Sequence, residues 1–320
     1  MRYTIRHVTR FTYETPITES VMEARMQPRS DGRQRCLQFT LSTQPASRVL
    51  MYEDHDRNVV HHFNVPGRHA RLALTAEAMV ECSPAPEIPP ALPEDAWSRL
   101  DQMAASGEFW DLLAPSRFAE RTDALFALAR AIGLTRGRDP LSTLRSVMRA
   151  MYERFEYSLQ STRVDSRIDE ALAARRGVCQ DFSHIFIALA RQLGIPTRYV
   201  SGYLFRDESA TDRSRDGATH AWAESLLPGL GWAGFDPTNN IIAGERHILV
   251  AVGRDYADVP PTRGVFKGAS AVRSDLSVAV RIGPVAPPDA VDSVPFTPWM
   301  SRDVMSVPRD TDAEQQQQQQ

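Results

Sequence analysis

A helix-forming segment that begins at a cysteine is the feature that most constrains the fold of this chain. After Cys179, apolar residues recur at helical spacing: Phe182, Phe186, Leu189, Ala190 and Leu193. Gly194 and Pro196 end the pattern, which predicts a helix with one buried face. Gly177 allows the backbone to turn sharply just before it. Cys179 therefore falls at the helix start, where unpaired N–H groups and the helix dipole favour a thiolate.

Two later segments carry the other side chains that a cysteine nucleophile needs. His220 opens a strand-like run, His-Ala-Trp-Ala-Glu, and Asp236 ends a second one, Gly-Trp-Ala-Gly-Phe-Asp. Between them, residues 228–231 (Pro-Gly-Leu-Gly) predict the turn of a hairpin. Adjacent antiparallel strands would place His220 within side-chain reach of Asp236. A thiolate that attacks a carbonyl, an imidazole that moves the proton and a carboxylate that orients the imidazole form a catalytic triad.

Each of these residues has a structural alternative when it is considered alone. A free cysteine is often buried and inert. A single histidine in an apolar strand is more often a core residue, and an aspartate before a proline often caps a turn. The three segments taken together favour catalysis over these alternatives.

Residues around the triad are candidates for contacts with the substrate. Gln180 and Tyr157 are candidate oxyanion contacts. Trp222 is a candidate wall of the cleft, although packing on the sheet is the better interpretation. Asp181 and His184 flank the nucleophile, and we expect them to be solvated or to bond a neighbouring loop.

These segments resemble the transglutaminase-like core. The resemblance is carried by residues 177–184, 190–203, 219–224 and 231–238. The opening residues 2–13 are similar to the N-terminal β domain of the bacterial branch described as transglutaminase-like cysteine proteases, and residues 253–265 resemble another of its segments. The likeness covers nearly the whole chain except the last ~30 residues, a boundary set by composition.

The resemblance implies both a fold and residue roles. Cys179 corresponds to the nucleophile, His220 to the general base and Asp236 to the orienting acid. The implied fold is papain-like, with the cysteine-bearing helix packed on an antiparallel sheet that carries the other two. Members of the wider superfamily hydrolyse peptides, cross-link glutamine to lysine or transfer acyl groups, and a shared fold does not choose among these reactions.

Composition excludes several classes of protein. With 37 basic and 40 acidic residues, the chain lacks the basic excess of a nucleic-acid-binding protein. No run approaches the ~18 apolar residues of a membrane span, and no secretory signal precedes the first strand pattern. Three cysteines without a signal favour a reducing cytoplasm. We expect no cofactor and no metal, because no Cys/His pair has zinc-finger spacing and the adjacent His61 and His62 would point to opposite faces of a strand.

The pattern along the chain predicts two domains of an α+β protein. Residues 1–82 alternate between apolar and polar and predict an antiparallel β-sandwich. A Pro-rich linker and connecting segment is expected over 83–120, the catalytic domain over 121–284 and a disordered tail over 285–320. Within the catalytic domain we expect helices over 123–131, 140–155 and 168–174, and strands near 198–205, 219–227, 231–236 and 246–252.

The function that this sequence predicts is acyl transfer through a thioester on Cys179. Water as the second nucleophile would make the protein a cysteine peptidase or amidase acting on a peptide or protein substrate, which is the expected activity. An amine as the second nucleophile would make it a protein-glutamine acyltransferase. A non-catalytic peptide-binding module is the third alternative. Fast alkylation of Cys179 compared with Cys36 and Cys82 would separate an enzyme from such a module.

Overall fold

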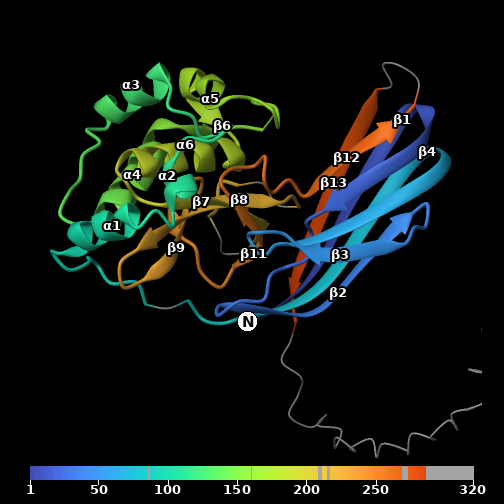
Figure 1. Cartoon of the computed structure of the whole chain (residues 1–320), viewed down its shortest axis with the longest axis horizontal. Helices are drawn as coiled ribbons and strands as arrows, with labels where there is room; N and C mark the ends of the chain where they lie inside the picture. The colour runs from blue at the N-terminus through green and yellow to red at the C-terminus, as the bar shows by residue number, and fades with distance from the viewer. Residues whose placement is uncertain (86, 160, 208–210, 215–216, 269–272, 286–320) are drawn as a thin grey trace, which may run out of the picture. The chain divides into compact units, whose positions relative to one another are not determined.

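The computed structural model describes residues 1–85, 87–159, 161–207, 211–214, 217–268 and 273–285. Apart from Val285, the tail expected from residue 285 onward lies outside this part. The described chain forms an antiparallel sheet from its N-terminal residues and a second sheet covered by helices (Figure 1). This arrangement confirms the predicted α+β class and its two components.

Two long antiparallel strands form the centre of the first sheet. Its strands are β1 (Arg2–Ala24), β2 (Gln34–Gln44), β3 (Val49–Glu53), β4 (Val59–Cys82), β12 (Thr262–Lys267) and β13 (Ser274–Pro284). β1 pairs with β4 along most of its length, and the register shifts between Thr12 and Glu19. Side chains from both sides of this irregularity, such as Leu74 and Phe63, enter one buried cluster. The two halves of the sheet therefore face each other like the layers of a sandwich.

The C-terminal end of the predicted catalytic range belongs to this first sheet. β13 pairs antiparallel with the first half of β1, and β12 pairs with its second half. The range 121–284 expected for the catalytic domain therefore ends in two strands of the N-terminal sheet. β1 would otherwise present a row of unpaired backbone groups along its outer edge, which β12 and β13 satisfy.

The second sheet supports the predicted catalytic residues. It has the order β10-β9-β8-β7-β11 and is antiparallel. Its strands are β7 (Thr197–Leu204), β8 (His220–Leu227), β9 (Gly231–Asp236), β10 (Ile241–Ile242) and β11 (His247–Gly253). The four longer strands lie within a residue or two of the ranges predicted from the sequence.

Helices cover one face of this second sheet. They are α1 (Ala96–Ala105), α2 (Trp110–Leu113), α3 (Asp123–Ala131), α4 (Pro140–Arg154), α5 (Ile168–Ala174) and α6 (Cys179–Gln192). Capping residues explain two of the starts: Thr122 accepts from Leu125 N, and Asp139 accepts from Ser142 N just before Pro140. None of the described helices is both long and apolar enough to cross a membrane.

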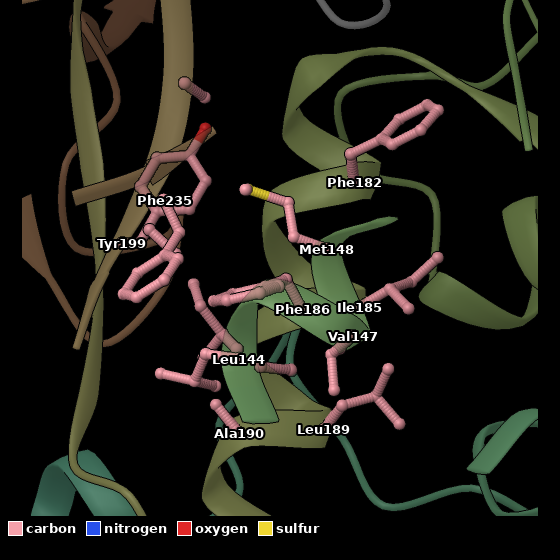
Figure 2. Packing of buried hydrophobic residues seen from close by; sticks show 14 of the residues in the cluster. Leu144, Val147, Met148, Phe182, Ile185, Phe186, Leu189, Ala190, Tyr199 and Phe235 are labelled. Atoms are coloured by element: carbon pink, nitrogen blue, oxygen red, sulfur yellow. The ribbon is translucent and has the colours of Figure 1, made fainter. Parts of the chain in front are cut away.

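The central helix α6 lies between α4 and the sheet. Figure 2 shows Leu144 and Met148 of α4 and Phe186 of α6 in one apolar layer that reaches Phe235 of β9. The rings of Phe186 and Phe235 stack with centroids 5.4 Å apart. Because α6 is buried on nearly all sides, its first residue is held firmly against the end of the sheet.

The segment expected to be a linker contributes to the catalytic core. α1 and α2 form within 83–120, and Leu92, Ala96 and Leu100 are buried in the same cluster as the catalytic helices. Five of the prolines in this range precede α1, and Pro115 follows α2.

Side chains from the first sheet complete the free edge of β11. Gln34 donates to Leu249 O and accepts from Leu249 N, at 2.7 and 2.8 Å. Asn58 makes the same pair of bonds with Val252 O and N, both at 2.8 Å. Two side-chain amides thus replace a neighbouring strand along this edge.

Candidate active site

Cys179 is the first residue of α6, and a short network fixes the turn that precedes it. The Asp181 carboxylate accepts hydrogen bonds from Val178 N at 2.8 Å and from the Thr162 hydroxyl at 2.6 Å. A Cβ at Gly177 would lie 2.8 Å from the Asp181 side chain, so only glycine fits there. Burial raises the pKa of Asp181 against the effect of these bonds. The sequence prediction that Asp181 bonds a neighbouring loop is confirmed.

His220 and Asp236 meet where two neighbouring strands pass each other. His220 is the first residue of β8 and Asp236 the last residue of β9. Nε2 of His220 lies 2.7 Å from Oδ2 of Asp236, and both side chains are buried. The backbone N–H groups of Thr238 and Asn239 donate to the other carboxylate oxygen at 3.1 and 3.2 Å. The carboxylate is therefore fixed in place, and through it the imidazole is oriented.

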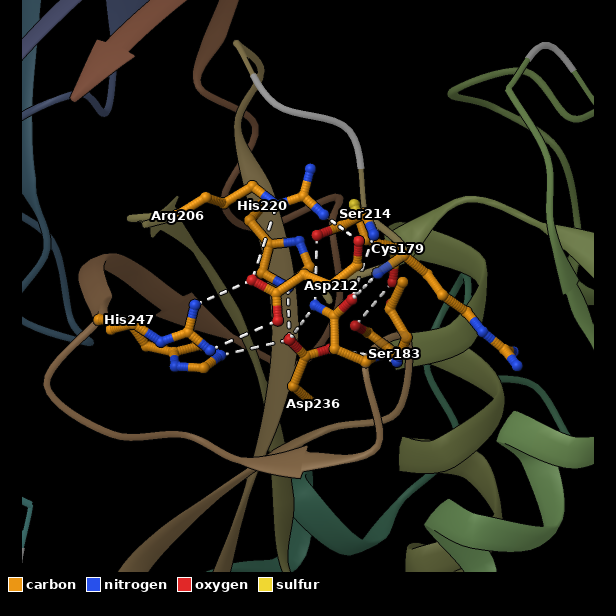
Figure 3. A network of polar contacts seen from close by, with 12 residues as sticks. Cys179, Ser183, Arg206, Asp212, Ser214, His220, Asp236 and His247 are labelled. Atoms are coloured by element: carbon orange, nitrogen blue, oxygen red, sulfur yellow. Dashed lines mark hydrogen bonds and ion pairs between the residues drawn. The ribbon is translucent and has the colours of Figure 1, made fainter. Parts of the chain in front are cut away.

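Two further side chains, those of Asn239 and His247, hold the same carboxylate, and neither was predicted from the sequence. Figure 3 shows His247 directed toward Asp236. Asn239 Nδ2 lies 2.7 Å from Asp236 Oδ2, and His247 Nε2 lies 3.2 Å from it. His247 opens β11, which is not adjacent to β9, so no local pattern links it to Asp236. Its position near the start of the strand predicted over 246–252 was the only signal in the sequence.

The tautomer of His247 follows from its second hydrogen bond. Its Nδ1 accepts from the backbone N–H of Gly244 at 3.2 Å, so this nitrogen carries no proton. The proton therefore lies on Nε2 and is donated to Asp236. Burial lowers the pKa of His247, and it is a neutral donor at neutral pH.

The electrostatics of the site favour a charged His220. Burial opposes the imidazolium, but the charge and hydrogen bond of Asp236, and then a hydrogen bond with Cys179, raise the pKa of His220 to about 10. The pKa of Asp236 is lowered far below its ordinary value, because its bonds to His220 and His247 outweigh its burial. An imidazolium beside a cysteine stabilises the thiolate, which is the nucleophilic form.

The same three side chains have the composition of a metal site. Ligand atoms of His220, Asp236 and His247 lie within 4.8 Å of one another. In the arrangement described, however, Nε2 of each histidine directs its proton at Asp236, which leaves no lone pair on that nitrogen for a metal. The residues are satisfied by one another as a hydrogen-bond network.

The three predicted substrate contacts lie in different surroundings. Gln180 donates to Val164 O at 3.0 Å, which orients its amide toward that loop. Tyr157 forms part of the short parallel pair β5 (Glu156–Tyr157) and β6 (Arg176–Gly177), opposite Gly177. Trp222 is buried and stacks on His220 with ring centroids 6.1 Å apart. Its packing in the sheet is the interpretation favoured above.

Comparisons with known proteins agree with this architecture. The family described as the transglutaminase-like superfamily matches residues 127–237, and the bacterial transglutaminase-like N-terminal region matches residues 3–81. A Mycobacterium leprae protein is 34% identical over 282 residues, covering 88% of this chain and 98% of its own. A Mycobacterium tuberculosis protein is 34% identical over 299 residues, covering 88% and 93%.

A solved structure has the same fold. The chain described as a putative cysteine protease from Cytophaga hutchinsonii aligns with a TM-score of 0.67 at 20% identity, and the alignment covers 89% of this chain and 92% of that one. Together with the two matched regions, which include Cys179, His220 and Asp236 as well as most of the first sheet, this shows that the chain belongs to the transglutaminase-like superfamily.

Proposed function

We propose that this protein is a cysteine enzyme that hydrolyses peptide or amide bonds through a thioester on Cys179. His220 passes a proton between the thiol, the leaving amine and the attacking water, and Asp236 orients His220. The observation that carries the proposal is the buried contact between His220 and Asp236 at 2.7 Å beside the first residue of α6. The site needs no cofactor for this reaction.

Each step follows from groups at the site. The thiolate of Cys179 attacks the acyl carbon, and the carbonyl oxygen gains negative charge. Backbone N–H groups in the first turn of α6 are available to stabilise that oxyanion. The imidazolium of His220 then protonates the leaving amine, and the neutral imidazole accepts a proton from water as the thioester is hydrolysed.

Cysteine usage also supports a reducing compartment, and we propose the cytoplasm. Cys36, Cys82 and Cys179 are all free thiols. Burial raises the pKa of Cys36, and it raises the pKa of Cys82 to about 11. Both thiols are therefore poor nucleophiles at neutral pH and serve as internal controls for Cys179.

Replacing the thiol tests the proposal. Wild type and Cys179→Ala are incubated with a peptide mixture and a primary amine, and the products are followed by mass spectrometry. We expect new peptide termini from wild type only, with turnover lost by at least ~10³-fold in the variant. A Cys36→Ala variant is the matched control and retains full turnover.

The same experiment separates the alternatives. Amine incorporated into glutamine with loss of ammonia would replace hydrolysis by protein-glutamine acyl transfer. Turnover that persists in Cys179→Ala would overturn the mechanism. An unreactive Cys179, alkylated no faster than Cys82, would point to a peptide-binding module.

A further inference from the structure

A groove lined by arginines lies at the turn that leads into α6. It encloses about 700 Å³ and is formed by the end of α4, β5, the end of α5 and β6, together with Arg213. Four arginines and two glutamates line it, so basic side chains outnumber acidic ones. They are Arg154, Arg175, Arg176 and Arg213, with Glu153 and Glu156. All four arginines are exposed, and none forms an ion pair with another residue in the described ranges.

One wall of the groove leads directly into the catalytic helix. β6 contains Arg176 and Gly177, and its backbone is held by Glu156 N to Arg175 O at 2.9 Å and Ser158 N to Gly177 O at 3.0 Å. Cys179 follows Arg176 by three residues, a span of at most ~11 Å. The wall of the groove that contains Arg176 therefore lies within ~11 Å of the Cys179 backbone.

The opposite wall is connected to the carboxylate of the site. The backbone N–H groups of Arg213 and Ser214 donate to Asn239 Oδ1 at 2.7 and 3.1 Å. The amide nitrogen of the same Asn239 side chain donates to Asp236. The Arg213 guanidinium is itself oriented, because it donates to Tyr152 O at 2.8 Å and lies over the Tyr152 ring.

The charge of the groove identifies its occupant. A guanidinium binds a carboxylate through two parallel hydrogen bonds, and this geometry suits Asp and Glu side chains or a free peptide carboxylate. A nucleic acid would need a continuous basic surface, whereas this chain has a net charge of −3 and the arginines gather in one groove.

We propose that this groove binds acidic side chains of the peptide substrate next to the bond attacked by Cys179, so that the enzyme selects acidic peptides. The inference rests on the proposed function for the identity of the substrate. Its test is a binding measurement that requires no turnover.

The experiment uses Cys179→Ala protein and three fluorescein-labelled peptides of equal length. They carry Glu, Gln or Lys at the same positions, and binding is followed by fluorescence anisotropy at low and high salt. We expect the Glu peptide to bind roughly tenfold more tightly than the Gln peptide at low salt, with the preference reduced at high salt. R175Q/R176Q added to this protein should remove the preference, while R175K/R176K, which keeps the charge but loses the paired hydrogen bonds, should keep only part of it.

A charge-matched control separates the groove from a general effect of charge. R130Q/R138Q removes two exposed arginines on and after α3, outside the groove, and should leave the preference unchanged. Equal binding of the Glu and Lys peptides, or an equal loss in this control, would overturn the inference. Inorganic phosphate that competes better than the unlabelled Glu peptide would also overturn it in favour of a phosphate site. Failure of the proposed function would appear separately, as missing turnover by wild-type protein.

Discussion

Two buried histidines of the catalytic domain are driven to opposite charge states. His184 lies in α6 between the rings of Phe118 and Tyr199, and burial together with the charge of Arg191 lowers its pKa to about 3. His220 is buried to a similar degree, but Asp236 raises its pKa to about 10. The difference lies in the neighbouring groups, since burial alone favours the neutral form in both. A single well-held carboxylate therefore separates a core histidine from a candidate catalyst.

Asp236→Asn is expected to have the largest effect, because it removes that carboxylate while keeping the shape of the side chain. With only Cys179 left to oppose burial, the pKa of His220 should fall steeply toward the low value of His184. We expect turnover to fall by about 10³–10⁴-fold, because the imidazole loses its orientation and its charge. The measurement is an NMR titration of the histidines combined with peptide turnover.

Asp255→Asn provides the matched control for a buried carboxylate. Asp255 accepts from Phe118 N and Ala257 N, both at 2.8 Å, and does not contact His220. This variant should leave the His220 titration unchanged. If His220 keeps its high pKa in Asp236→Asn, the explanation of the contrast is wrong.

The lowered pKa of His184 predicts a smaller effect, which is a loss of stability in acid. Above pH 6.5 its imidazole is neutral in both the folded and the unfolded chain and contributes nothing to the pH dependence. As the pH falls below 6.5, the unfolded chain binds a proton that the folded chain refuses until near pH 3. The free energy of unfolding should therefore fall by up to about 2 kcal/mol from this group at pH 5.

Urea unfolding of wild type and His184→Gln over pH 4–7 measures how much His184 contributes to the pH dependence of the free energy of unfolding. Glutamine can still accept the hydrogen bond that Tyr256 N donates to His184 at 3.2 Å. The free energy of unfolding should change less steeply with pH in the variant. The difference in slope should correspond to about one bound proton. An unchanged slope would mean that His184 is protonated in the folded protein. His220 has the opposite sign: its contribution is complete below pH 6.5 and is lost as the pH rises through about 10.

Local signals in the sequence predicted which segments form helices and strands. They did not predict which distant strands pair or which distant side chains meet. Asp139 and Pro140 mark the start of α4, and the hairpin turn before β9 explains why His220 meets Asp236. The pairing of β12 and β13 with β1 joins residues more than 200 positions apart. The contact of His247 with Asp236 depends on the order of strands in the sheet. Neither of these long-range contacts leaves a periodic pattern in the sequence.

His247 sharpens the contrast between the two histidine environments, because it is buried, neutral and in contact with the same carboxylate. In His247→Ala, Asp236 loses one donor and keeps the bonds from His220, Asn239 and two backbone N–H groups. We expect turnover to fall by about tenfold, which is the low end for losing one hydrogen bond to a charged group.

The way in which this loss appears distinguishes positioning from general damage to the fold. His247→Gln keeps an N–H donor near Asp236 and should recover most of the activity, while a purely structural role would leave both variants equally impaired. Because His247 acts through Asp236 rather than on the substrate, kcat should fall while KM changes little. The NMR titration of His220 should still show a raised pKa in both variants, since the charge of Asp236 remains. If that pKa fell as far as in Asp236→Asn, His247 would be as important to the charge state of the site as the carboxylate itself.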